Sequence, residues 1–232
     1  YLRYLERRGK SPATVTRSAA SLKSFYGYMQ ASGVMKANPA KAVVTHRAER
    51  KYPEILTNKE VELFLEQPRC VDAKGYRDHA MLELLYATGI RVSEVKHLTV
   101  EAARAGKAEI SLKGKIRTIL LPGKLCRKLL QYGRAQKIAS GEIFLTRSGR
   151  GISRKQVWAE MKAVCRKAGV ADSKVFPHNL RHLFARAFYQ ASRDVVKLAD
   201  VLGHSSIETT RIYLLSTGAE HARQLARLGL IS

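Results

Sequence analysis

Five polar side chains in this sequence of 232 residues are of types that could do chemistry together: Arg91, His178, Arg181, His204 and Tyr213. Arg91 follows an expected helix end. His178 and Arg181 are three residues apart near an expected helix start, so they share a helix face. Tyr213 comes nine residues after His204. Taken singly, each has an ordinary explanation as a surface arginine, a polar helix face, a turn histidine or a packed tyrosine.

Together, these residue types suit attack on a phosphodiester. Two guanidiniums, Arg91 and Arg181, hold non-bridging oxygens bidentately and keep their charge at any working pH. They would stabilise the negative charge that builds up in the transition state. Tyr213 would attack through its phenolic oxygen and form a covalent phosphotyrosine. Because the ordinary pKa of a tyrosine is about 10, Tyr213 needs a base or nearby cations in order to lose its proton. His178 is the candidate base.

A metal site is not expected at the histidines. His178 and His182 form an HxxxH pair, but Asn179 stands where a zinc protease motif has its glutamate, and Arg181 opposes a cation between them. No cysteine or carboxylate stands at ligand spacing nearby. The sequence also contains neither a P-loop nor a carboxylate cluster, so we expect no cofactor, no metal and no ATP.

The charge balance indicates a polyanionic partner. Lys and Arg number 42 against 19 Asp and Glu, which gives a formal charge of +23 and a pI of about 10.3. Residues 1–52 carry +9 of this and are about twice as basic per residue as the rest. Nucleic acid or an acidic membrane surface would both suit such a chain. The remaining evidence favours nucleic acid and no membrane.

Several features favour a cytoplasmic protein. No apolar run approaches the 18 residues or so of a membrane span, and no signal peptide is present. Three widely spaced cysteines, Cys70, Cys126 and Cys165, form no CxxC pair and are typical of a reducing compartment. The chain starts at Tyr1 without a methionine, so we expect a fragment of a longer protein.

Local signals predict a mainly α fold with a small antiparallel β-sheet. Ser11-Pro12 and Thr57-Asn58-Lys59-Glu60 are helix starts. Two β-prone runs, 108–112 and 116–121, are joined by Lys113-Gly114-Lys115 as a hairpin. Helices are expected from Pro12 to about 32, in a short stretch around Asn38-Pro39, from Thr57, and over 77–87, 123–138, 153–168, 178–191, 194–202, 206–215 and 217–232.

The order of these elements predicts two domains. Residues 1–46 form part of a helical DNA-binding domain, 47–54 form a polar, basic linker that ends near a proline, and 55–232 form the domain with the candidate site. The helix over 217–232 is the terminal tail of that second domain. We expect basic residues of the first domain, the linker and the hairpin to contact DNA: Arg17, Lys23, Arg47, Arg50, Lys51, Lys115 and Arg117.

The candidate residues, in this order, resemble the tyrosine recombinase or phage-type integrase family. The matching segments are Thr88-Gly89-Ile90-Arg91-Val92-Ser93-Glu94, Pro177-His178-Asn179-Leu180-Arg181-His182 and Leu202-Gly203-His204 through to Tyr213. The resemblance covers residue 53 to the end, and Xer-like recombinases and mobile-element integrases are most similar. It implies that Arg91, His178, Arg181, His204 and Tyr213 are catalytic, with a 3′-phosphotyrosine link and His204 donating a hydrogen bond to the phosphate.

The resemblance also implies a catalytic lysine in the hairpin. The family has Gly-Lys-Gly followed by Lys-x-Arg, whereas this chain has Leu112-Lys113-Gly114-Lys115-Ile116-Arg117, one residue shorter. Lys113 is our choice for the general acid that protonates the leaving oxygen, and Lys115 is the alternative. Glu94 is expected to support Arg91, and His182 to be a packed helix residue.

The function that follows is a site-specific recombinase that acts on double-stranded DNA. Its protomers would self-associate on DNA, as a tetramer in the synaptic complex, and the tail helix could dock on a neighbour. A type IB topoisomerase shares the nucleophile chemistry, and a non-cleaving DNA-binding accessory protein shares the fold. The second alternative would have lost an Arg, His or Tyr of the set, and none is lost here.

Overall fold

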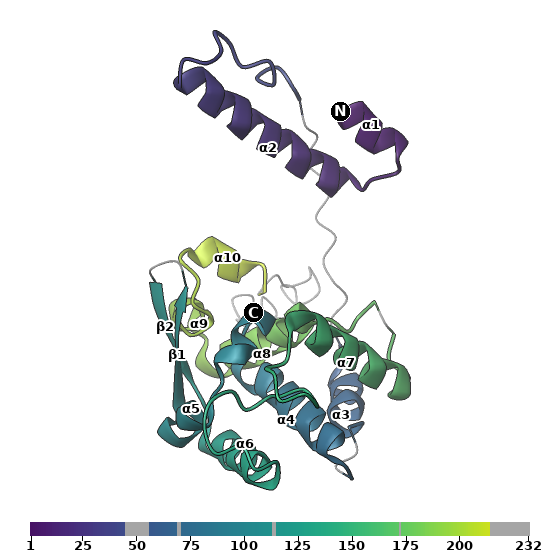
Figure 1. Ribbon diagram of the computed structural model, residues 1–232, viewed down its shortest axis with the longest axis vertical. Helices are drawn as coiled ribbons and strands as arrows, with labels where there is room; N and C mark the ends of the chain where they lie inside the picture. Colours follow the sequence, from purple (N-terminus) through teal and green to yellow (C-terminus); the bar gives the residue numbers. More distant parts are fainter. Residues whose placement is uncertain (45–55, 69–70, 113–114, 172, 214–232) are drawn as a thin grey trace, which may run out of the picture. The chain divides into compact units, whose positions relative to one another are not determined.

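The computed structural model describes residues 1–44, 56–68, 71–112, 115–171 and 173–213. The chain divides into two compact units, residues 1–52 and 53–232, and each is described by itself (Figure 1). The expected linker over 47–54 and tail helix over 217–232 lie outside the described residues. No helix in the described part is long and apolar enough to cross a membrane.

The first unit contains two helices, α1 (Leu2–Arg7) and α2 (Pro12–Ala31). Helix α2 begins where the sequence predicted, because the Ser11 hydroxyl accepts a hydrogen bond from the Thr14 amide at 3.3 Å and proline occupies the first helical position. Helix α1 was not predicted. It is a single short element that packs against α2.

The short helix predicted around Asn38-Pro39 is wrong, because this segment forms turns. The Asn38 side chain explains the difference. Its Oδ1 accepts a hydrogen bond from the Ala40 amide at 2.8 Å, and its Nδ2 donates to the Lys23 carbonyl at 3.2 Å. An asparagine side chain that bonds the backbone locally competes with helical hydrogen bonds and favours a turn.

The second unit is mainly helical with one antiparallel hairpin, as predicted. Strands β1 (Lys107–Leu112) and β2 (Lys115–Leu120) pair with Leu112 opposite Lys115 and Ile110 opposite Arg117. Besides the 3₁₀ helix η1 (Val92–His97), its described helices are α3 (Asn58–Glu66), α4 (Ala73–Thr88), α5 (Val100–Ala105), α6 (Gly123–Ala135), α7 (Arg154–Lys167), α8 (Pro177–Ser192), α9 (Val195–Leu202) and α10 (Ile207–Arg211).

Helix α4 lies at the centre of the second unit and packs against α3, α6, α7 and α8. Its apolar side chains, Met81 and Leu85 among them, join one large core that extends to β1 and β2. A smaller buried cluster lies around the later part of α8, and it contains Leu198, Leu202 and Tyr213. These two cores hold the ends of α4, α8 and α9 together, and the candidate site lies at those ends.

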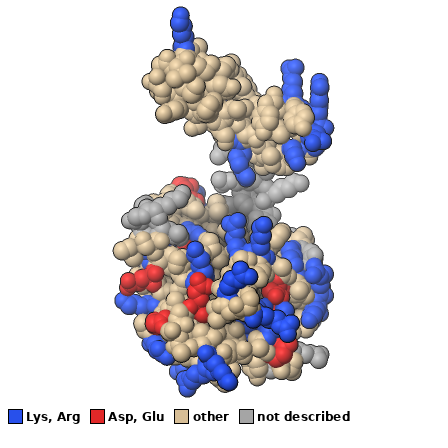
Figure 2. Space-filling model, viewed as in Figure 1, with Lys and Arg blue, Asp and Glu red and all other residues tan. Residues whose placement is uncertain are grey.

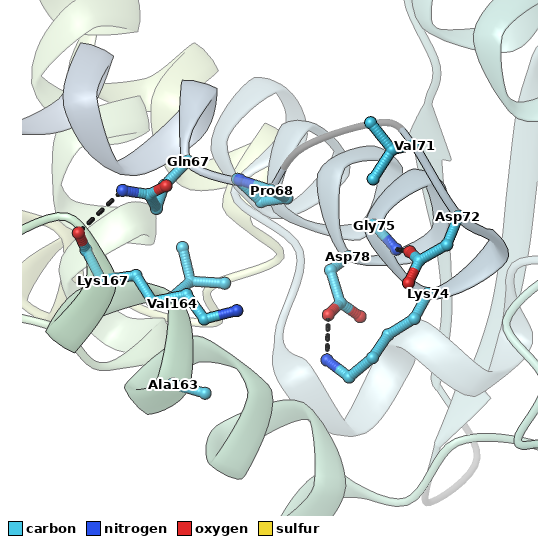
Figure 3. A pocket seen from close by; sticks show the side chains of 10 residues that line it. All are labelled: Gln67, Pro68, Val71, Asp72, Lys74, Gly75, Asp78, Ala163, Val164 and Lys167. Carbon is cyan, nitrogen blue, oxygen red and sulfur yellow. Dashed lines mark hydrogen bonds and ion pairs between the residues drawn. The ribbon is translucent and has the colours of Figure 1, made fainter.

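Ion pairs fix α7 against α4. The guanidinium of Arg77 on α4 lies 2.9 Å from both Asp78 and Glu160, and Glu160 belongs to α7. Lys74 Nζ lies 2.6 Å from the Asp78 carboxylate. Figure 3 shows this pair in a pocket bordered by α3, α4 and α7, where Gln67 also donates to the Lys167 carbonyl at 2.7 Å. These contacts hold the middle of α7 against α4 and its last residue against the end of α3.

Basic side chains are spread over both units (Figure 2). On the face drawn, the first unit shows Lys and Arg without Asp or Glu, whereas the second unit shows both signs interspersed. This distribution agrees with the sequence, in which residues 1–52 carry eleven basic and two acidic residues. The first unit is therefore the more strongly basic of the two for its length.

Candidate active site

Arg91 is positioned by the turn that ends α4. Gly89 terminates that helix in the left-handed conformation, with φ of 58°, and a Cβ there would lie 2.4 Å from Phe184 Cδ1. The backbone therefore passes close to α8 and leads directly into η1. The Arg91 amide donates to Glu94 Oε2 at 2.9 Å, and its Nη1 donates to Glu94 Oε1 at 3.0 Å.

Glu94 holds two arginines, as well as the backbone of Arg91. It is buried, and Arg117 Nη1 donates to its Oε2 at 2.7 Å. Although burial raises the pKa of Glu94, the hydrogen bond from the Arg91 amide and the charges of Arg117 and Arg91 outweigh it, so the pKa lies below its ordinary value. Glu94 is therefore a carboxylate near neutral pH, as its expected supporting role requires.

Arg117 extends this contact to α9. Its Nη2 donates to the Val201 carbonyl at 2.9 Å, and its aliphatic stem packs on Gly203 so closely that a Cβ there would lie 2.4 Å from Arg117 Cδ. The side chain is only 12% exposed. The sequence predicted a DNA contact for Arg117, whereas the guanidinium of the free protein is engaged inside it.

Arg181 is the largest fully buried side chain among the described residues, at 2% exposed. Its Nη1 donates to the Gly89 carbonyl at 2.5 Å, and its Nη2 donates to the Leu202 carbonyl at 2.6 Å and to His204 Nε2 at 3.0 Å. Burial lowers its pKa to about 10, helped by the charge of Arg91 and opposed by Tyr213. Arg181 is therefore charged near neutral pH and fixed at the junction of α4, α8 and α9.

His204 follows Gly203, which ends α9 in the left-handed conformation with φ of 63°. Its ring lies between Arg181 and Thr210, with Nδ1 at 2.9 Å from Thr210 Oγ1. Burial lowers the pKa of His204 to about 4, and the charges of Arg181, Arg91 and Arg117 contribute. The ring is therefore neutral near pH 7.

Tyr213 lies against both histidines of the cluster. Its ring centroid is 4.2 Å from that of His182 and 5.6 Å from that of His204, and it is nearly parallel to the latter. It is 8% exposed, and its phenol lies near enough to Arg181 to oppose the lowering of that guanidinium's pKa. Tyr213, His182, His204 and Arg181 are thus gathered within one chain.

His178 and Arg91 complete the cluster, because with Arg181 they line one pocket. Burial lowers the pKa of His178, and the charges of Arg181 and Arg91 lower it further. All five residues identified first in the sequence are therefore gathered around Arg181. The imidazole of His178 is therefore neutral near pH 7, so it can accept the phenolic proton as a base must.

Some of the residues around this cluster were not predicted from the sequence. Thr210 contacts His204, and α7 brings Arg154, Lys155 and Trp158 to the pocket that holds Arg91 and His178. A capping box at Ser153 marked the start of α7, and so the position of Arg154, but nothing in the sequence placed that start beside Arg91. Among the described residues, no three His, Cys, Asp or Glu side chains gather as a metal site.

Other predicted residues lie elsewhere or outside the described part. Lys113 falls in the undescribed turn of the hairpin, and only the backbone of Lys115 is described, opposite Leu112. Arg17 and Lys23 lie on α2 in the first unit. The linker residues Arg47, Arg50 and Lys51 lie outside the described residues.

Comparisons with known proteins show to which class of protein a chain with this cluster belongs. Residues 54–220 match the model of the phage integrase family. The tyrosine recombinase XerD of Listeria innocua is 31% identical over 92% of this chain and 75% of its own length. XerC of Roseiflexus castenholzii is 33% identical over 90% of this chain and 70% of its own length.

Solved structures share the fold. The Tn1549 transposon integrase in complex with transposon right end DNA superposes with a TM-score of 0.76 at 17% identity, over 99% of this chain and 83% of that one. A lambda integrase dimer bound to a COC′ core site gives 0.72 at 18% identity, over 94% and 78%. The chain therefore belongs to the phage integrase family and is a tyrosine site-specific recombinase.

Proposed function

We propose that this chain cleaves and rejoins double-stranded DNA through a covalent 3′-phosphotyrosine link at Tyr213, without ATP or metal. The observation that carries the proposal is one cluster in which Tyr213 stacks on His204, His204 lies beside Arg181, and Arg181 lines a pocket with Arg91 and His178. The XerC and XerD relatives favour recombination over simple relaxation of supercoils.

The first step is attack of the Tyr213 phenolic oxygen on the scissile phosphorus. A new O–P bond forms, the bond from phosphorus to the 5′ oxygen breaks, and the phenolic proton passes to His178. The electron pair of the broken bond leaves with the 5′ oxygen, which takes a proton from a lysine of the hairpin. Lys113 is our choice for this general acid and Lys115 the alternative.

Arg181 and Arg91 stabilise the charge that develops on the non-bridging oxygens. Three of the five N–H donors of Arg181 bond Gly89, Leu202 and His204, so the guanidinium is held rigid while the others serve Tyr213 and the phosphate. Donors preorganised in this way act without reorganisation during the reaction. His204 is proposed to donate a further hydrogen bond to the phosphate.

Religation reverses this sequence with a 5′ hydroxyl from a second strand. The phosphotyrosine link keeps the energy of the broken phosphodiester, which is why neither ATP nor a metal is required. We further propose that protomers self-associate on DNA, as a tetramer in the synaptic complex. Arg17, Lys23, Arg47, Arg50, Lys51 and Lys115 are the proposed phosphate contacts outside the site, and Glu94 supports Arg91.

The test is capture of a covalent adduct. The protein is incubated, in EDTA, with duplex oligonucleotides of random sequence that each carry a nick, because a nick lets the short cleaved strand diffuse away and traps the intermediate. Wild-type protein should give a protein–DNA band on a denaturing gel, and sequencing of the trapped DNA gives the site. Tyr213→Phe should give none.

Tyr76→Phe is the matched control, because Tyr76 is an exposed tyrosine of the same unit, on α4. It should form the adduct at the wild-type level. DNA retention without an adduct would support the non-cleaving alternative. An adduct that forms only when EDTA is omitted would overturn the metal-free mechanism.

A further inference from the structure

Thr210 contacts one candidate catalytic residue with its hydroxyl and another with its carbonyl. Its Oγ1 lies 2.9 Å from His204 Nδ1, and its carbonyl accepts a hydrogen bond from the Tyr213 amide at 3.0 Å. Thr210 lies on α10 and is wholly buried, at 0% exposed. Because it is wholly buried, it would act on the reaction through these two residues.

The contacts of His204 determine its tautomer in the free protein. A guanidinium only donates hydrogen bonds, so His204 Nε2, 3.0 Å from Arg181 Nη2, must accept. In a neutral imidazole the proton then resides on Nδ1, and Nδ1–H donates to Thr210 Oγ1. The free protein therefore holds the tautomer that cannot donate from Nε2.

The proposed reaction requires the opposite tautomer. To donate a hydrogen bond to the phosphate, Nε2 must carry the proton, and Nδ1 must then become an acceptor. The ring keeps the same charge, since Nδ1 releases one proton to solvent and Nε2 takes one up. A hydroxyl is the group that suits both states, because it accepts from Nδ1–H in the first and donates to Nδ1 in the second.

We propose that Thr210 is a positioning residue that orients the His204 ring and supports both of its tautomers, so that Nε2 can change from an acceptor of Arg181 to a donor to the phosphate. This inference rests on the proposed function. It assigns Thr210 no contact with DNA. The side chain acts only through His204.

The test compares Thr210→Val with Thr210→Ser in single-turnover cleavage of a nicked duplex that carries the site recovered from the random pool. Valine has the shape of threonine without the hydroxyl, and we expect cleavage about tenfold slower with unchanged DNA affinity. Serine keeps the hydroxyl and should restore most of the rate. Thr209→Val, at the exposed neighbour on the same helix, is the matched control and should cleave like wild type.

A double-mutant cycle separates positioning from general damage. If Thr210 acts through His204, Thr210→Val should slow a His204→Ala protein much less than it slows wild type. Equal slowing in both backgrounds, or wild-type cleavage by Thr210→Val, would overturn the inference while wild-type cleavage upholds the proposed function. A wild type that forms no adduct would overturn the proposed function and this inference with it.

A second measurement reads the tautomer directly in the wild-type protein and does not depend on cleavage. Nitrogen-15 NMR of the free wild-type protein distinguishes the two tautomers of each histidine ring, and His204→Gln identifies the His204 signals. The proton should reside on Nδ1. A signal showing it on Nε2 would overturn the proposal.

Discussion

Glu94 and Arg117 form a buried ion pair, with Arg117 Nη1 at 2.7 Å from Glu94 Oε2. The pair joins η1 to β2, and the second contact of Arg117, to the Val201 carbonyl, joins both to the end of α9. Since Glu94 also holds Arg91, one carboxylate connects this proposed catalytic arginine to the turn that carries His204. We expect changes at this pair to alter stability and cleavage together.

Glu94→Gln should destabilise the protein strongly. The amide has the shape of the carboxylate but leaves Arg117 and Arg91 without a counter-charge, and breaking a buried pair typically costs about 3–5 kcal/mol. Urea unfolding should show this loss, and cleavage should fall because Arg91 loses its support. Glu62→Gln, at an exposed position of α3, is the control and should unfold like wild type. An unchanged midpoint for Glu94→Gln would contradict the supporting role.

Arg17 and Lys23 test whether the first unit binds phosphates. Each neutralised phosphate contributes about −0.9 to the slope of log K against log salt concentration, so Arg17→Gln and Lys23→Gln should each flatten the slope by about one. Arg117→Gln provides the contrast, because its guanidinium is engaged with Glu94 and Val201. It should leave the slope unchanged and slow cleavage. A flatter slope for Arg117→Gln would favour the direct DNA contact that the sequence predicted.

Gly203 occupies a position where an added methyl group has no room. Its φ of 63° is left-handed, which costs about 1–2 kcal/mol for alanine, and the methyl group would also meet Arg117 Cδ at 2.4 Å. Gly203→Ala should therefore lower both the unfolding midpoint and the cleavage rate. Gly106→Ala is the matched control, with φ of 71° and open space around the Cβ, and it isolates the backbone cost. If Gly203→Ala and Gly106→Ala had equal effects, the contact with Arg117 would contribute nothing to the loss of stability and cleavage.

Local signals in the sequence were enough for most of the fold. The capping box at Thr57 and the glycine after α4 define helix ends through contacts within a few residues, and the structure confirms both. The segment at Asn38 was mispredicted because its side chain bonds the Ala40 amide, which favours a turn, and is also held by the distant Lys23 carbonyl. Helix α5 and η1 are too short for their apolar residues to show a clear helical period in the sequence.

The site was predictable as a set of residues but not as a network. The order of the five residues identified them, whereas the contacts of Thr210 and Arg117 depend on how α9, α10 and β2 meet. One signal for Arg117 was present in the sequence. Side chains alternate along a strand, and Arg117 shares its face of β2 with Ile119, which is buried. The prediction that Arg117 contacts DNA gave more weight to the basic sequence of the hairpin than to this alternation.

The histidines around Tyr213 predict a pH-dependent stability. The pKa values of His182 and His204 lie at about 4, chiefly because of burial, with the charge of Arg181 contributing to both. The unfolded chain binds these protons near pH 6.5, so between these values it binds more protons than the folded chain. The contribution of these two histidines to the free energy of unfolding is therefore fully present above about pH 6.5 and falls as the pH is lowered towards 4.

His182→Phe tests this dependence, because it keeps an aromatic ring against Tyr213 and removes one titrating group. Urea unfolding between about pH 7 and pH 5 should show stability falling with pH in both proteins, but less steeply in the variant. This range lies above the ordinary pKa values of Asp and Glu, so carboxylates contribute little to the slope. Equal slopes would mean that His182 binds its proton as readily when folded as when unfolded, and that burial beside Tyr213 does not hold it neutral.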